Sequence, residues 1–342
     1  MKSRLPLLAL ALGLLLPASN PAIAATPEPA LRTLTLGAYT TPREVYGKAI
    51  IPAFQKYWKQ KTGQDVRFQE SYLGSGAQAR AIVGGFEADV AALSLEADID
   101  SIARAGLIQR DWRQGPGQGM VTRSVVVIAV RKGNPKAIRD WDDLRRTGLQ
   151  VLTPNVRTSG GAKWNIGALY GAAMRGATRA TKGDAAAAET LLRDVLRNVT
   201  VMDKGARESM INFEKGVGDV AITYENEVLV GRKSGEDYEY VVPRASILIE
   251  NPAAVVDKYA DKHGTRDLAE AFVRFLTTPE AQRVFATYGL RAVDAGVAKE
   301  TAANFPPVRD LFNIRDLGGW PQLDKTLFAP NGVYERAMAG TR

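Results

Sequence analysis

Four short turns carry the residues best suited to hold a ligand. Each follows a strand-like run and opens a helix-like run with small or hydroxyl residues. The four are Thr40-Thr41-Pro42, Gly74-Ser75-Gly76, Ser159-Gly160-Gly161 and Gly205-Ala206-Arg207. The first N–H groups of a helix lack partners within the helix and carry partial positive charge, so such a turn can bind an anion without Lys or Arg. One turn of this kind is common loop chemistry, but four together indicate an anion held mainly by N–H donors.

The turn at Ser159 has the most complete set of signals. The apolar run Leu149–Leu152 predicts a strand, and Ala162–Tyr170 predicts a helix. Ser159 stands at the N-cap position of that helix, and Gly160 and Gly161 leave the first N–H groups unobstructed. Taken alone, this stretch favours an ordinary capped helix start. Its three companion turns, which lie at the carboxyl ends of predicted strands, favour a binding site.

Residues that could carry catalysis are scarce. The chain has no cysteine, and its one histidine, His263, stands in a polar turn that predicts a solvated loop. Cys/His chemistry and a multi-histidine zinc site are therefore excluded, and a Ser-His-Asp arrangement is disfavoured. Glu225 and Glu227 could form an acid/base pair or ligate a hard cation, but we expect them to cap and solvate a helix start. We expect no catalytic residue, no metal site and no cofactor.

The first 24 residues have the three-part pattern of a secretory signal peptide. Lys2 and Arg4 precede the apolar run Leu5–Leu16, and Ala22-Ile23-Ala24 offers small residues for cleavage. No later stretch approaches the roughly 20 apolar residues of a membrane helix. Without a cysteine for lipid attachment, we expect an exported protein that is free in the periplasm.

The formal charge of +8 comes from scattered Lys and Arg without a long basic block, so no nucleic-acid partner is expected. The length of 342 residues suits two domains. Strand-like and helix-like runs alternate, which predicts α/β architecture with mainly parallel sheets. The predicted units are the signal peptide (1–24), a discontinuous first lobe (25–121 and 252–342) and a second lobe (122–251). Strands near Val121–Val130 and Ile249–Val256 would cross between the lobes, and the tail from Phe305 is expected to be rich in loops.

A series of short motifs runs through the mature chain. They are Pro42-Arg43-Glu44, Lys59-Gln60-Lys61-Thr62-Gly63-Gln64, Gly74-Ser75-Gly76 with Gln78, Gly85-Phe86-Glu87-Ala88-Asp89-Val90, Arg131-Lys132-Gly133-Asn134-Pro135-Lys136, Thr153-Pro154-Asn155, Ser159-Gly160-Gly161-Ala162, Gly205-Ala206-Arg207, Gly216 with Gly218-Asp219-Val220, Glu225-Asn226-Glu227 and Gly318-Gly319-Trp320. In order and spacing, this series resembles the periplasmic sulfate-binding proteins that serve ABC importers.

The resemblance implies a two-lobed periplasmic binding protein of type II, each lobe a mixed, mainly parallel sheet flanked by helices. A hinge would close the lobes on a dehydrated sulfate dianion in the interlobe cleft, and the protein, a monomer, would deliver it to a membrane permease. Carried onto this chain, the family's site implies backbone donors at Ser75, Gly160, Gly161 and Ala206, the hydroxyl of Ser159, the turn at Thr40, and the aromatic position Tyr224.

Two positions depart from the family pattern. Thr40 stands where an aspartate is typical, and Tyr224 stands where a tryptophan precedes Glu-Asn. A phenol also donates a hydrogen bond, but from a different distance than an indole. A site with donors alone should reject hydrogen phosphate, whose O–H would find no acceptor. Sulfate or thiosulfate is the expected ligand, with molybdate or an organosulfur anion as alternatives. An exported hydrolase of sulfate or phosphate esters could use the same turns, but it would need a nucleophile or a metal.

Overall fold

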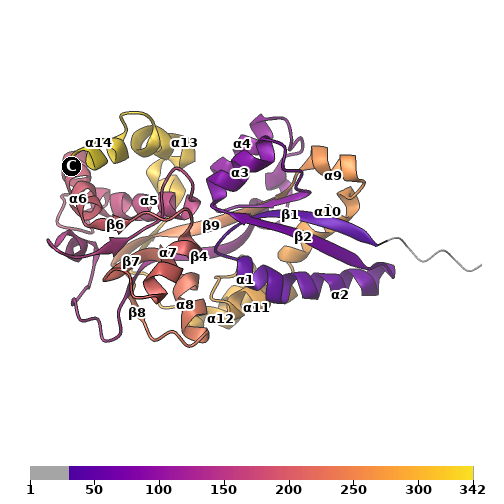
Figure 1. Ribbon diagram of the computed structural model, residues 1–342, viewed down its shortest axis with the longest axis horizontal. Helices are drawn as coiled ribbons and strands as arrows, with labels where there is room; N and C mark the ends of the chain where they lie inside the picture. The colour runs from indigo at the N-terminus through magenta and orange to yellow at the C-terminus, as the bar shows by residue number, and fades with distance from the viewer. Residues whose placement is uncertain (1–30, 342) are drawn as a thin grey trace, which may run out of the picture. The chain divides into compact units, whose positions relative to one another are not determined.

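Strands and helices alternate through most of the chain, as the sequence predicts, in a computed structural model that describes residues 31–341 (Figure 1). The predicted signal peptide, residues 1–24, lies outside the described residues. The strands are β1 (Arg32–Tyr39), β2 (Val66–Leu73), β3 (Val90–Ala92), β4 (Met120–Val130), β5 (Val151–Leu152), β6 (Val199–Val201), β7 (Val220–Tyr224), β8 (Glu239–Val241), β9 (Ala245–Val255) and β10 (Asp310–Phe312).

The α-helices are α1 (Arg43–Val45), α2 (Ile51–Thr62), α3 (Ser75–Val83), α4 (Glu96–Arg104), α5 (Gly160–Met174), α6 (Ala185–Arg197), α7 (Ala206–Glu214), α8 (Glu225–Lys233), α9 (Asp257–His263), α10 (Arg266–Leu276), α11 (Pro279–Thr287), α12 (Ala295–Thr301), α13 (Gly319–Leu323) and α14 (Val333–Ala339). Short 3₁₀ segments cover Trp112–Gln114, Pro116–Gly119, Trp141–Arg145, Ala302–Asn304 and Ile314–Leu317, and π-helical turns cover Tyr46–Ile50 and Asp324–Phe328. Within residues 31–341, every helix is too short or too polar to cross a bilayer.

The strands pair in the order β2-β1-β3-β9-β4-β7-β5-β6, with β10 beside β9 and β8 beside β4. The pairs β1–β2, β1–β3, β5–β6 and β5–β7 are parallel, whereas β4 and β9 pair antiparallel with their neighbours in this order. We call the part built on β1, β2 and β3 the first lobe and the part built on β5, β6 and β7 the second lobe. The long strands β4 and β9 join them, at the two crossings that the sequence indicates. The prediction of a mainly parallel α/β fold is confirmed.

The core of the first lobe is organised by alternating residues of β1. Leu34, Leu36 and Ala38 are fully buried, because side chains two residues apart in a strand share one face. This face packs on aromatic side chains of α2 and α10, where the ring centroids of Phe54 and Phe272 lie 5.0 Å apart in an edge-to-face contact. The packing fixes the carboxyl ends of β1 and β2, from which the predicted turns at Thr40 and Ser75 project.

The core of the second lobe includes the C-terminal segment. Trp320 contacts Trp164 of α5 edge-to-face, with ring centroids 4.7 Å apart. Phe312 lies against Gly171, where a Cβ would be 2.5 Å from the Phe312 ring. The sequence predicts 252–342 for the first lobe, but Phe312–Ala337 contributes to the second-lobe core because the glycine-containing face of α5 accommodates these large rings. The expectation of a loop-rich tail from Phe305 is also wrong, since this segment contains β10, α13 and α14.

His263 lies at the end of a helix rather than in a loop, but it is exposed, as the sequence predicts. It is the last residue of α9, and its ring nitrogens lie 2.7 Å from Asp89 Oδ1 and 3.0 Å from Glu87 Oε2. Burial acts to lower the pKa of His263, but the two carboxylates outweigh it, and the net pKa is raised. The histidine therefore ties α9 to the segment that enters β3.

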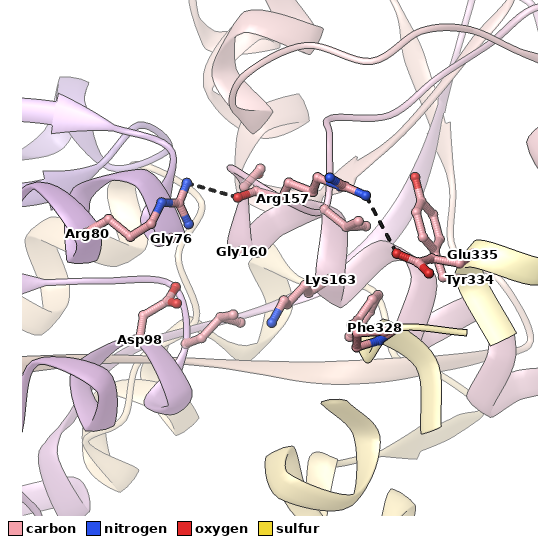
Figure 2. Close-up of a pocket in the computed structure, with 13 residues that line it drawn as sticks. Gly76, Arg80, Asp98, Arg157, Gly160, Lys163, Phe328, Tyr334 and Glu335 are labelled. Carbon is pink, nitrogen blue, oxygen red and sulfur yellow. Dashed lines mark hydrogen bonds and ion pairs between the residues drawn. The ribbon is translucent and has the colours of Figure 1, made fainter. Parts of the chain in front are cut away.

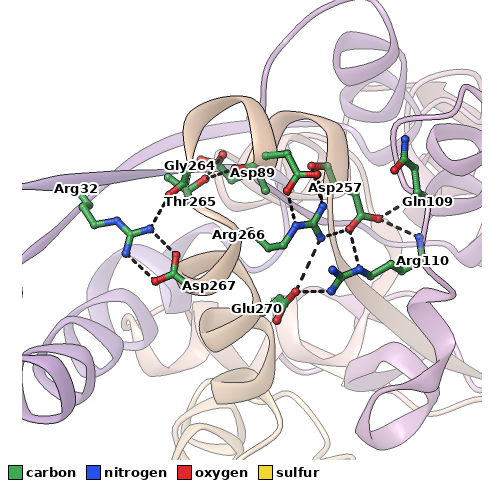
Figure 3. A network of polar contacts seen from close by, with 12 residues as sticks. Arg32, Asp89, Gln109, Arg110, Asp257, Gly264, Thr265, Arg266, Asp267 and Glu270 are labelled. Carbon is green, nitrogen blue, oxygen red and sulfur yellow. Dashed lines mark hydrogen bonds and ion pairs between the residues drawn. The ribbon is translucent and has the colours of Figure 1, made fainter.

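A polar network fixes α9 and α10 on the first lobe (Figure 3). The buried carboxylate of Asp257 accepts the backbone N–H groups of Gln109 and Arg110, at 2.7 and 3.0 Å, and a hydrogen bond from Arg266. Burial acts to raise the pKa of Asp257, but these donors outweigh it and lower the pKa. The network is remote from the four predicted turns and serves to hold the helices in place.

Candidate functional site

All seven residues that the sequence predicts for the site come together where the two lobes meet. We call these residues, Thr40, Ser75, Ser159, Gly160, Gly161, Ala206 and Tyr224, the cradle. Each of them is buried. They stand at the ends of β1 and β7 and at the starts of α3, α5 and α7, so the alternation of strand and helix positions them.

Gly161 forms the centre of the second-lobe half of the cradle. A Cβ at Gly161 would lie 3.1 Å from Ala206 Cβ, 3.3 Å from Ser159 Oγ and 3.9 Å from Tyr224 Cζ. The predicted capping role of Ser159 is confirmed, because its Oγ accepts the Ala162 N–H at 3.3 Å. Since the oxygen accepts in this bond, the hydroxyl proton is left to donate to a ligand.

The first-lobe half approaches the second through Ser75 and Thr40. Ser75 Oγ accepts the backbone N–H of Ser94 at 2.9 Å and donates to Asp98 Oδ2 at 2.5 Å. The side chain of Ser75 is therefore occupied, and its backbone N–H is what it can offer to a ligand. Thr40 lies against the α7 start, where a Cβ at Gly205 would be 2.8 Å from Thr40 Oγ1.

The backbone donors of the cradle lie at helix starts. The N–H groups of Ser75, Gly160, Gly161 and Ala206 belong to the first turns of α3, α5 and α7, where no helical acceptor exists. They also have no recorded acceptor elsewhere among residues 31–341. A buried donor without a partner costs roughly 1–3 kcal/mol. Several such donors facing one place indicate a site for an acceptor-rich ligand.

Tyr224 forms an uncharged wall of the cradle. Its side chain is fully buried, and its ring contacts Tyr39 edge-to-face with centroids 6.4 Å apart. Burial raises the pKa of the Tyr224 phenol well above its ordinary value, so the group stays protonated. The Tyr224 Oη lies 2.6 Å from Ser94 Oγ, across the lobes.

The charged side chains beside the cradle are paired with one another in salt bridges. Arg207 binds Glu214 at 2.9 Å and Glu227 at 3.3 Å, and Arg291 binds Glu225 through two hydrogen bonds of 2.7 and 2.9 Å. The expectation that Glu225 and Glu227 are solvated is wrong, because they are only 0% and 1% exposed. Burial raises the pKa of Glu227 to about 7, against the attraction of Arg207.

An open pocket of about 530 Å³ lies beside the cradle and shares Ser159 and Gly160 with it (Figure 2). On one side of the pocket, Arg80 of α3 donates to the Arg157 carbonyl of the second lobe at 3.0 Å. The Arg157 side chain is paired with Glu335 at 3.6 Å. Together with the Ala77 N–H, which donates to the Thr158 carbonyl at 3.2 Å, these contacts hold the lobes against each other.

The described residues contain no group of three or more His, Cys, Asp or Glu side chains placed to hold a metal ion. The sequence analysis missed two residues beside the cradle, Ser94 and Tyr39. Ser94 follows the end of β3 and Tyr39 ends β1. The rule that ligands collect at the carboxyl ends of strands would have selected both, since it selected the neighbouring turns.

Known proteins resemble this chain over most of its length. Residues 34–291 match the family model described as bacterial extracellular solute-binding protein. The sulfate-binding protein of Synechococcus elongatus is 45% identical over 90% of this chain and 87% of its own length. The thiosulfate-binding protein of Pseudomonas aeruginosa is 36% identical over 87% of this chain and 90% of its own length.

Among solved structures, the sulfate-binding protein SubI from Mycobacterium tuberculosis is similar with a TM-score of 0.79 and 38% identity, covering 87% of this chain and 99% of that chain. The resemblance inferred from the short motifs is confirmed. The chain belongs to the bacterial extracellular solute-binding proteins and, among them, to the family of the sulfate-binding proteins.

Proposed function

We propose that this protein binds sulfate or thiosulfate in the cradle and delivers the anion to an ABC importer. The observation that carries the proposal is the convergence of uncharged donors from both lobes in one buried place. Four backbone N–H groups at helix starts and the Ser159 hydroxyl would supply these donors, while Arg207 is engaged with carboxylates. A dehydrated dianion needs many hydrogen-bond donors, and this set provides them from uncharged groups.

The same donors favour a fully ionised anion over a protonated one. The oxygen of Ser159 already accepts from Ala162, and the oxygens of Ser94 and Tyr224 are paired with each other. The proton of hydrogen phosphate would thus lack an acceptor, which costs roughly 1–3 kcal/mol. We expect sulfate and thiosulfate to bind and phosphate to be rejected. Molybdate is an alternative ligand, because Tyr224 gives one wall of the cradle a different shape from that made by the tryptophan typical of the family.

The remaining parts of the proposal concern the setting in which the protein acts. Residues 1–24 would direct export to the periplasm, where the protein would act as a monomer without catalytic activity. The lobes would close by a hinge at β4 and β9, with residues 25–121 in the first lobe and 122–251 mainly in the second. The relatives named above are binding proteins, which supports a role in transport over ester hydrolysis.

Calorimetric titration with sulfate, thiosulfate, molybdate and phosphate tests the proposal. The expected result is binding of sulfate or thiosulfate at one site, with phosphate far weaker. Binding of phosphate as tight as that of sulfate would contradict it. Incubation with sulfate and phosphate esters, with and without divalent metals, tests the hydrolase alternative, and turnover would reverse the assignment.

A further inference from the structure

Ser94 touches both lobes of the cradle although it is not among the seven predicted residues. It follows β3 in the first lobe and is fully buried. Its Oγ lies 2.6 Å from Tyr224 Oη, and a Cβ at Gly160 would lie 2.6 Å from the same Oγ. Only glycine at position 160 leaves room for this hydroxyl, so Ser94 Oγ lies directly beside the α5 start.

The backbone of Ser94 is held independently of its hydroxyl. Its N–H donates to Ser75 Oγ at 2.9 Å, and its carbonyl accepts from Trp164 Nε1 at 3.0 Å and from Asn251 Nδ2 at 3.1 Å. These three bonds fix the position from α3, α5 and β9. The Ser94 hydroxyl is therefore not needed to keep this segment in place, and its bond to Tyr224 calls for a separate explanation.

The hydroxyl pair holds two protons, of which one is used in the mutual hydrogen bond. An anion in the cradle favours the arrangement in which Tyr224 donates to the anion and Ser94 donates to Tyr224, because each bond in such a chain strengthens the next. In this arrangement the Tyr224 oxygen accepts from Ser94. It is then unavailable as an acceptor for a protonated ligand.

We propose that Ser94 is a specificity-determining residue, which acts by orienting the Tyr224 hydroxyl as a donor and by occupying its acceptor site. This inference rests on the proposed function. The Ser94–Tyr224 pair thereby replaces a single indole donor and selects fully ionised tetrahedral anions over protonated ones. Ser94 is a positioning residue, because it acts on the ligand through Tyr224.

Titrations of Ser94→Ala, Tyr224→Phe and the double variant with sulfate and with inorganic phosphate test the inference. We expect Ser94→Ala to weaken sulfate binding about tenfold, because the Tyr224 hydroxyl loses the partner that orients its hydrogen bond to the charged ligand, and to narrow the preference for sulfate over phosphate. In the Tyr224→Phe background, Ser94→Ala should leave that preference unchanged, because the phenol through which it acts is gone. Wild-type affinity and preference in Ser94→Ala would overturn the inference.

A second pair of variants separates orientation of Tyr224 from general support of the fold. An indole at position 224 carries its own N–H donor and needs the space that the Ser94 hydroxyl occupies. We therefore expect Ser94→Ala to improve sulfate binding in a Tyr224→Trp background, while it weakens binding in the wild-type background. Weakening in both backgrounds would mean a structural role and would overturn the inference. Failure of the wild-type protein to bind sulfate or thiosulfate would instead overturn the proposed function, and the inference with it.

Discussion

Gly74 of the first lobe lies directly against the Thr158 carbonyl of the second, where a Cβ would be 2.5 Å from the oxygen. The same Cβ would lie 2.6 Å from the Lys204 carbonyl. Both obstacles are backbone atoms and cannot turn aside as a flexible side chain can. The contact therefore requires glycine for reasons of space, and it brings the α3 start against the segments that precede α5 and α7.

Gly74→Ala should disfavour the closed arrangement of the lobes. Gly74 has φ −56° and ψ 140°, which alanine adopts without strain, so the open form should be unaffected. Overpacking of this kind costs about 1–3 kcal/mol, which corresponds to a roughly 5- to 150-fold loss of sulfate affinity. Titration measures the loss, and small-angle scattering with saturating sulfate measures compaction.

Gly47→Ala is the matched control for this prediction, because a Cβ there would meet only Glu70 Oε2, at 3.7 Å. It should bind sulfate as the wild-type protein does. If Gly74→Ala also retains full affinity, the Gly74–Thr158 contact is not part of the ligand-bound form.

Gly161→Ala should abolish binding while it preserves the fold. The added methyl group would project between Ser159 and Ala206, where the anion is expected. Alanine within a helix is more favourable than glycine by up to about 1 kcal/mol, so the unliganded variant should unfold at the same or a higher temperature. Calorimetry and thermal unfolding separate the two effects.

Gly167→Ala in the same helix provides the comparison, since its Cβ would meet Leu323 Cδ2 at 3.4 Å, away from the cradle. Normal sulfate binding is expected from this control. Normal binding by Gly161→Ala would show that the anion sits elsewhere.

Glu227→Gln should change how stability depends on pH. The pKa of Glu227 in the folded chain, about 7, is above the ordinary value of 4.5, because burial opposes its charge more strongly than Arg207 supports it. The protonated carboxyl therefore adds to the free energy of unfolding. This contribution is complete below pH 4.5 and is lost as the pH rises through 7. The difference between the two pKa values corresponds to roughly 3 kcal/mol.

Urea unfolding between pH 4.5 and 8 measures this effect, with Glu214→Gln as the control for the other carboxylate on Arg207. The wild-type protein should lose more stability than Glu227→Gln as the pH rises. If stability falls equally with pH in the wild-type protein and in Glu227→Gln, the pKa of Glu227 is not raised in the folded chain.

The local signals of the cradle were readable from the sequence because each depends on neighbours in the chain. A serine before two glycines at a strand-to-helix junction specifies its own cap and its own free N–H groups. Thus Ser159, Gly160 and Gly161 could be predicted, as could the turns at Ser75 and Ala206. The α/β fold followed from alternation of strand and helix patterns for the same reason.

Features that depend on distant partners could not be read in this way. Glu225 and Glu227 have the local pattern of a solvated helix start, and only the fold brings Arg291 and Arg207 to them. The position of Ser94 after β3 could have been selected by the strand-end rule, but its role could not, because it depends on Tyr224, which is 130 positions away. The sequence predicts the C-terminal segment in the first lobe because no local pattern indicates that Phe312 and Trp320 pack against the distant helix α5.

Calorimetric titration of the wild-type protein and of Ser159→Ala with sulfate, thiosulfate and phosphate tests whether the cradle is the anion site. We expect the wild-type protein to bind one sulfate or thiosulfate per chain and to bind phosphate far more weakly. Ser159→Ala should bind sulfate at least about tenfold more weakly, because it lacks one donor to the charged ligand. Equal affinity of Ser159→Ala and the wild-type protein for sulfate, or no binding of either anion to the wild-type protein, would contradict it.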